Sequence, residues 1–110
     1  MELVEDALML RIYVGESDKN GHEPAYKAIV HLLRREAIWG ATVTRGIYGF
    51  GKKSVLHTAN PLRLSGDLPI IIEAIDRRTK IEAVVPKVAP LVKGGLIVTM
   101  PVQAHVRVEP

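Results

Sequence analysis

Two closely spaced glycines followed by two lysines form the segment of this sequence best suited to chemistry. The run GIYGFGKKS, residues 46–54, comes close to the phosphate-binding pattern G-x-x-x-x-G-K-[S/T]. Its eighth position is Lys53 instead of the hydroxyl residue that would hold magnesium, so the run does not predict a P-loop nucleotide hydrolase. Backbone N–H groups at Gly49 and Gly51 can still approach an anion closely, and Lys52 stands beside them. We therefore expect either an anion-binding turn or a glycine-rich turn with a purely structural role.

Basic charge is concentrated in the middle of the chain. The 110 residues have a formal net charge of +3 and a pI near 9.4, yet no acidic residue lies between Glu36 and Asp67. The basic side chains in that interval are Arg45, Lys52, Lys53, His57 and Arg63. This pattern predicts an anion site, with a solvated loop or a nucleic-acid-binding module that uses segment 45–63 as the alternatives. Nucleic acid is not the expected partner, because the RNA-binding signature suggested by RGIYGF at 45–50 belongs on a third strand and would here lie on the second.

Several kinds of chemistry lack the residues that they need. The chain has no cysteine, which excludes disulfides, thiolate metal sites and cysteine nucleophiles. Its histidines, at 22, 31, 57 and 105, show no metal-binding spacing, and no nucleophile motif is present. We expect neither a metal site nor an enzyme. Residues 1–6 hold three acids and no basic segment, and no apolar run approaches the ~20 residues of a membrane span, so we expect a cytoplasmic protein.

Four segments have the apolar and β-branched content of strands. They cover residues 7–14, 42–48, 69–75 and 96–108, the last one broken or bulged at Pro101. Between the second and third strands, residues 49–68 show no period and form a long loop, of a length that is usually functional.

Two further segments have the apolar spacing of helices. One begins at Pro24 and is expected to stop at Gly40. The other is expected to follow Asp76 as its N-cap residue and to break near Val85, because Pro86 and Pro90 cannot donate helical hydrogen bonds.

The order of elements, βαββαβ, predicts one α+β domain over residues 1–110. It is a ferredoxin-like sandwich, an antiparallel sheet with both helices on one face. The other face would then be bare. The apolar strand residues that we expect as candidates for this bare face are Ile12, Val43, Ile71 and Val98. Because such a patch is unfavourable in water, we expect the chain to form an oligomer.

Taken together, these segments resemble the PII signalling proteins across nearly the whole chain. The shared pattern comprises GATVT at 40–44, GFG at 49–51, LPIIIE at 68–73 and GLIVT at 95–99. Closer still is the PII-like family catalogued as domain of unknown function 190. Its markers here are YKAIV at 26–30, GATVTRGIYGFG at 40–51, SGDLP at 65–69 and GGLI at 94–97.

The resemblance implies a ferredoxin-like subunit of a homotrimer that binds adenine nucleotides in clefts between subunits. A long mobile loop would meet a partner protein, with a membrane transporter as one candidate, and no cofactor would be required. Carried over residue by residue, the nucleotide-binding set predicted by motif and resemblance is Thr42, Gly49, Phe50, Gly51, Lys52, Lys53, Lys93, Gly94, Gly95 and Arg107. In this set Thr42 would lie near the base, the 93–95 turn around the phosphates, and Arg107 against a phosphate.

Three positions depart from the PII pattern. Leu96 stands where those proteins have a lysine, Lys53 where they have a glutamine, and Glu109 where they have a second arginine. Fewer charge-assisted contacts to phosphate are therefore available. We expect AMP or ADP to be favoured over ATP as the ligand.

Overall fold

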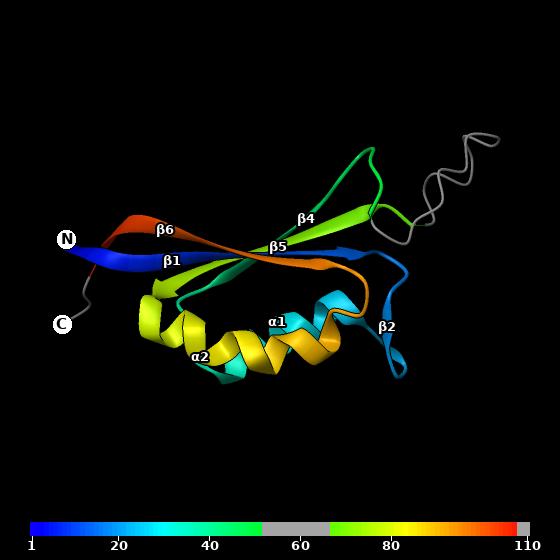
Figure 1. Ribbon diagram of the computed structural model, residues 1–110, viewed down its shortest axis with the longest axis horizontal. Coiled ribbons are helices and arrows are strands. Elements are labelled where there is room, and N and C mark those ends of the chain that lie inside the picture. Colours follow the sequence, from blue (N-terminus) through cyan, green and yellow to red (C-terminus); the bar gives the residue numbers. More distant parts are fainter. Residues whose placement is uncertain (52–66, 108–110) are drawn as a thin grey trace.

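The computed structural model describes residues 1–51 and 67–107, and Figure 1 shows the arrangement of their elements. The elements are β1 (Glu2–Gly15), β2 (Lys19–Asn20), β3 (Glu23–Pro24), α1 (Ala25–Arg35), β4 (Ala41–Arg45), β5 (Pro69–Arg77), α2 (Arg78–Val88), a 3₁₀ turn (Ala89–Leu91) and β6 (Leu96–Val106). Four strands form one antiparallel sheet in the order β4-β5-β1-β6, and β2 pairs with β3 in a small hairpin. This is the predicted ferredoxin-like fold.

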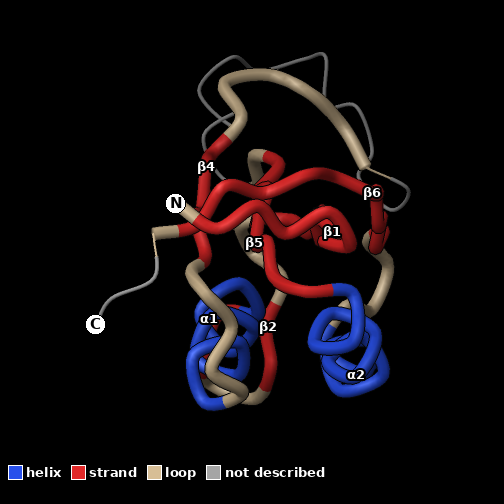
Figure 2. The backbone as a smooth tube through the Cα atoms, turned by 90° about the vertical axis from the view of Figure 1, so that its left-hand side faces the viewer, coloured by secondary structure: helices blue, strands red, loops and turns tan. Residues whose placement is uncertain are grey.

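The core lies between the sheet and the two helices. Figure 2 shows α1 and α2 side by side on the same face of the sheet. Alternate residues of β1, among them Leu10 and Ile12, are fully buried on this face, as is Ile72 of β5. The helices contribute the buried side chains Ile29, Leu33, Ile81, Val84 and Val88. Burial of these branched side chains is the main force that holds the two layers together.

Helix α1 ends at Arg35, five residues before the predicted stop at Gly40. Ala37 adopts the left-handed conformation, with φ of 56°. The N–H of Ala37 donates to the carbonyl of Arg34, and that of Ile38 donates to the carbonyl of Leu33. These two bonds form a Schellman motif, which usually has glycine in the left-handed position. The prediction was wrong because an alanine fills this role here.

Asp76 is not the N-cap of α2, in contrast to the prediction. It belongs to β5 and is 2% exposed, and its carboxylate accepts hydrogen bonds from the backbone N–H groups of Trp39, at 3.1 Å, and Arg77, at 2.6 Å. Strand alternation puts Asp76 on the helix-covered face, where it stabilises the connection between α1 and β4.

Helix α2 runs through Pro86 without the predicted break near Val85, and it gives way to a 3₁₀ turn only at Ala89. The carbonyl that Pro86 leaves without a helical donor belongs to Glu82, which is exposed and can bond to water. Buried Ile81, Val84 and Val88 keep the helix packed on the sheet.

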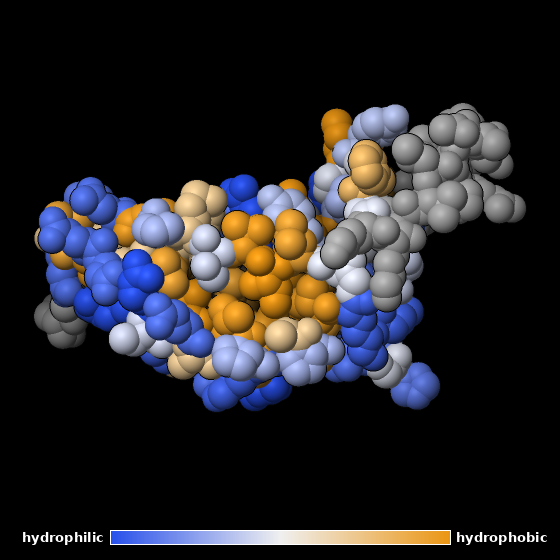
Figure 3. All heavy atoms as spheres, viewed as in Figure 1, coloured by the Kyte–Doolittle hydropathy of each residue, from blue (hydrophilic) through white to orange (hydrophobic). Residues whose placement is uncertain are grey.

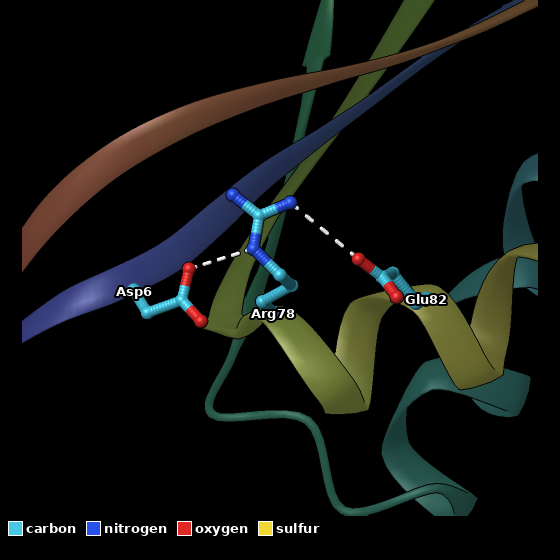
Figure 4. A network of polar contacts seen from close by, with 3 residues as sticks. All are labelled: Asp6, Arg78 and Glu82. Carbon is cyan, nitrogen blue, oxygen red and sulfur yellow. Dashed lines mark hydrogen bonds and ion pairs between the residues drawn. The ribbon is translucent and has the colours of Figure 1, made fainter.

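The first turn of α2 is held to β1 by an ion-pair network (Figure 4). Arg78 places Nε 2.6 Å from Oδ1 of Asp6 and Nη1 3.4 Å from Oε1 of Glu82. Hydrogen bonding to Asp6 raises the pKa of Arg78, so this side chain stays charged.

The strands differ in detail from the prediction. Strand β1 begins at Glu2, with an irregularity between Val4 and Ala7, whereas β6 passes through Pro101 unbroken. As an edge strand, β6 has one side without a hydrogen-bonding partner in the sheet, which tolerates a proline. Strand β4 ends at Arg45 instead of residue 48.

The face of the sheet away from the helices carries apolar side chains around one ion pair. Arg11 of β1 pairs in register with Glu73 of β5 on one side and with Val98 of β6 on the other. Nη2 of Arg11 lies 2.6 Å from Oε2 of Glu73. Of the predicted apolar candidates, Ile71 and Val98 lie on this face. Ile12 does not, because it is fully buried against the helices, and Val43 pairs with buried Ile72 on the helix side. The other apolar members by register include Met9, Tyr13, Ile75, Leu96, Met100 and Val102. We call this surface the uncovered sheet face.

Within the described ranges, the helices are too short to cross a membrane.

Candidate functional site

A groove of about 980 Å³ lies where β1 ends and β6 begins, beside the β2–β3 hairpin at the right of Figure 1. Its apolar lining is Tyr13, Val14, Phe50, Pro69 and Leu96. Its glycines are Gly15, Gly51, Gly94 and Gly95, and its charged residues are Asp18, Lys19, Asp67 and Lys93. The groove therefore combines flat apolar surface, accessible backbone and charges of both signs.

The turn at 93–95 can form only because it contains glycines. A β-carbon on Gly95 would lie 1.9 Å from the carbonyl oxygen of Tyr13, and Gly94 has a φ of 153°, where side chains are rarely tolerated. These glycines let the chain leave the 3₁₀ turn and enter β6 tightly against β1. Backbone of the turn thus forms one wall of the groove.

The segment at 46–51 reaches the groove with its last two residues, Phe50 and Gly51. The N–H of Gly46 donates to the carbonyl of Pro69 at 2.7 Å, which holds the start of the segment on β5. Gly49 has a φ of 155°, and Phe50 is 71% exposed at the mouth of the groove. An exposed aromatic ring beside a glycine is well suited to stack on a flat ligand.

The turn between β1 and β2 holds both ends of the segment that joins β4 to β5. At one end, Glu16 pairs with Arg45 at 2.8 Å. At the other end, Asp67 accepts hydrogen bonds from the hydroxyl of Ser17 at 2.8 Å and from its N–H at 3.3 Å. The N–H of Glu16 also donates to the carbonyl of Leu68. Sequence reasoning identified residues 16–21 as a polar turn but missed its place at the site, because only the pairing of Gly15 with Pro69 brings it there.

Half of the predicted binding residues come together in this groove. Phe50, Gly51, Lys93, Gly94 and Gly95 line it, and Gly49 precedes Phe50. Lys52 and Lys53 lie outside the described residues, as does Glu109.

Thr42 and Arg107 do not line the groove. Thr42 is exposed on β4, opposite Glu73. Arg107 follows the far end of β6, and at about 3.3 Å per residue the strand separates it from the groove by about 35 Å. A groove in one copy of the chain thus cannot include its own Arg107.

The groove opens onto the uncovered sheet face. Tyr13 and Leu96 pair in register, point to that face and line the groove. Hydrogen bonding to Tyr13, and to a lesser degree to Glu73, raises the pKa of Arg11, which stays charged in its ion pair with Glu73. Figure 3 shows apolar side chains gathered over β6 and α2. Leu96 and Met100 of β6 are 55% and 40% exposed.

The alternative use of segment 45–63 for nucleic acid finds little support in its described part. Arg45 is engaged by Glu16, and residues 47–50 are uncharged. No three His, Asp or Glu side chains within residues 1–51 and 67–107 are grouped to hold a metal ion.

Comparison with known proteins supplies a family and a fold. The sequence profile of the DUF190 family, described as "Uncharacterized ACR", matches residues 7–104. The UPF0166 protein MJ1524 of Methanocaldococcus jannaschii is 44% identical over 93 residues, which cover 84% of this chain and 85% of that protein.

Solved structures with this fold include CPII and a PII-like protein. CPII of Thiomonas intermedia, bound to ADP and bicarbonate, superposes with a TM-score of 0.67 at 18% identity, covering 94% of this chain and 91% of CPII. CPII bound to ADP, AMP and acetate gives a TM-score of 0.61, also at 18% identity, with 96% and 94% covered. A Thermus thermophilus protein described as a putative PII-like signaling protein gives a TM-score of 0.51 at 18% identity, with 94% and 91% covered.

Proposed function

Because this chain belongs to the DUF190 family and has the fold of PII-like signalling proteins, as its sequence predicted, we propose that it is a non-catalytic regulatory protein. It binds an adenine nucleotide in grooves between subunits. The bound nucleotide changes how the segment between β4 and β5 acts on a partner protein, for which a membrane transporter is one candidate.

The observation that carries this proposal is the meeting of two glycine turns from distant parts of the chain. Gly51 and the turn at 93–95 face one groove, with Tyr13 and Phe50 offering aromatic surface for a base and Lys93 offering charge for phosphate. CPII, which shares the fold, was solved with ADP and with AMP. An adenine nucleotide is thus the ligand that the lining chemistry supports best.

Assembly into a homotrimer is the second part of the proposal. The uncovered sheet face carries apolar side chains that a second copy would remove from water, which is favourable. Tyr13 and Leu96 belong to both this face and the groove. Contact between subunits would therefore close the open side of the groove, and only a second copy can bring Arg107 close to it.

Nucleotides with short phosphate chains are the expected ligands. Leu96 lines the groove and is 55% exposed, at the position where PII proteins have a lysine. AMP or ADP needs fewer cationic partners than ATP to offset the loss of water from its phosphates.

Calorimetric titration with AMP, ADP, ATP and cyclic AMP, together with the mass from light scattering, tests the proposal. We expect a trimer that binds AMP or ADP with micromolar affinity and binds ATP more weakly. A trimer that binds none of them would exclude the nucleotide part, and a monomer would contradict the placement of the groove between subunits.

A further inference from the structure

Two carboxylates approach the same side of Gly15 in the groove. An ideal β-carbon on Gly15 would lie 2.7 Å from Oδ1 of Asp67 and 3.2 Å from Oδ1 of Asp18. Both side chains are held by backbone of the turn after β1. Oδ2 of Asp18 accepts from the N–H of Gly15 at 2.9 Å, and Oδ1 of Asp67 accepts from the N–H of Ser17 at 3.3 Å. The absence of a side chain at Gly15 lets these negative charges come together.

These carboxylates offset the positive charge of the groove. Among its described lining residues, Asp18 and Asp67 oppose Lys19 and Lys93, so the formal charges cancel. A phosphate in the groove is attracted by the lysines and repelled by the aspartates, and repulsion grows with each charge on the ligand. The wall at Asp18 and Asp67 thus opposes a long phosphate chain more strongly than a short one.

We propose that Asp18 and Asp67 are specificity-determining residues that limit the number of phosphates on the nucleotide. This inference rests on the proposed nucleotide site and assigns its selectivity to two residues of this chain. Selectivity for short phosphate chains then has two sources. The carboxylates repel additional phosphates, and Leu96 provides no positive charge where PII proteins have a lysine.

A different role for the same carboxylates makes a different prediction. They could accept hydrogen bonds from the ribose hydroxyls or the adenine amine, which are identical in AMP, ADP and ATP. Loss of those bonds would then weaken the binding of all three nucleotides equally. One oxygen of each carboxylate is engaged by the protein itself, which leaves the other oxygen as an acceptor. Affinities for all three nucleotides therefore separate the two roles, because only charge repulsion depends on the number of phosphates.

The test compares the wild-type protein with Asp18→Asn, Asp67→Asn and the double variant, by calorimetry with AMP, ADP and ATP. Asparagine keeps an acceptor oxygen for the bonds to Gly15 and Ser17 and removes only the charge. We expect the ratio of ATP affinity to AMP affinity to rise at least about threefold in the double variant. This gain should shrink at high salt, because screening weakens charge repulsion.

Two control variants separate charge from structure. Glu5→Gln removes an exposed acid at the other end of β1 and should leave the ratio unchanged. Ser17→Ala removes the hydroxyl that holds Asp67 but keeps its charge, so it should change the ratio less than Asp67→Asn. Two results would overturn the inference while leaving the nucleotide site intact. One is an equal change in affinity for all three nucleotides, and the other is an unchanged ratio of ATP affinity to AMP affinity in a folded double variant. A wild-type trimer that binds no nucleotide would overturn the proposed function and this inference with it.

Discussion

Gly95 packs so tightly on Tyr13 that a β-carbon at Gly95 would stand 1.9 Å from the carbonyl oxygen of Tyr13. The same β-carbon would be 3.0 Å from Cγ1 of Val92. A backbone oxygen in the central strand cannot rotate away, so the start of β6 would have to shift. This contact connects the wall of the groove directly to the centre of the sheet.

Substitution Gly95→Ala should therefore damage both stability and binding. We expect the free energy of unfolding to fall by about 1–3 kcal/mol, as for other overpacked sites, and nucleotide affinity to fall at least about tenfold. Urea denaturation and calorimetry measure the two effects. Gly40→Ala is the matched control, since nothing lies within 4 Å of its β-carbon position. Equal effects at both positions would contradict the steric explanation.

Substitution Ala37→Gly should stabilise the protein. Ala37 holds the left-handed conformation that ends α1, and glycine adopts it without the strain caused by a β-carbon. We expect a gain of about 0.5–1 kcal/mol in the free energy of unfolding, measured by thermal or urea denaturation. Gly21 has a φ of 64° in open space, so Gly21→Ala should lower stability by a similar amount. A loss of stability in Ala37→Gly would argue against the Schellman geometry.

Lysines next to the glycine turns should contribute to phosphate binding. We expect Lys93→Ala to weaken the binding of ADP more than the binding of AMP, because the additional phosphate of ADP loses an attractive charge. The double substitution Lys52→Ala, Lys53→Ala should lower affinity for both. Lys27→Ala on the exposed side of α1 is a control for general charge, and it should leave both affinities unchanged. Unaltered binding in the lysine variants would place the phosphates elsewhere.

The ion pair between Glu36 and Lys87 should make stability depend on pH in the acid range. Their side chains meet at 2.7 Å, and this hydrogen bond lowers the pKa of Glu36 from its ordinary value of 4.5. A carboxyl whose folded pKa is depressed contributes stability above its unfolded pKa and loses it as the pH falls through the folded pKa. Lys87→Met should therefore raise the pKa of Glu36 in an NMR titration and reduce stability at neutral pH. Below the folded pKa of Glu36, the two proteins should be equally stable with respect to this pair.

A charge placed on the uncovered sheet face tests whether this face is the interface between subunits. Val98 lies there by register beside Arg11, so Val98→Asp should prevent assembly of the proposed trimer. Light scattering should show a smaller species, and nucleotide affinity should fall with it. Ile47→Asp introduces the same group at a position that is 94% exposed outside the sheet, and it should leave the mass unchanged. A Val98→Asp protein of wild-type mass would exclude this face as the interface.

Local patterns in the sequence were enough to predict the order of the four main strands and the two helices, and with it the ferredoxin-like fold. They did not predict the small β2–β3 hairpin. Residues 7–14 and 69–75 could be recognised as strands because both are short runs of apolar and β-branched residues. The glycine turns at 49–51 and 93–95 could be recognised for a similar reason. Glycine is required wherever the backbone is crowded or left-handed, as at Gly49, Gly94 and Gly95.

Tertiary structure alone decided where the strands end, which face is bare and which residues line the groove together. Ala37 ends α1 because Ile38 turns back to pack near Leu33, and no local signal marks an alanine for that role. Asp76 is buried because its strand carries it under the α1–β4 connection. Asp18 and Asp67 are 49 positions apart in the chain, and they meet only because Gly15 pairs with Pro69 across two strands. Pairing between distant strands depends on the whole sheet, so the charge balance of the groove could not be derived from the segments that supply it.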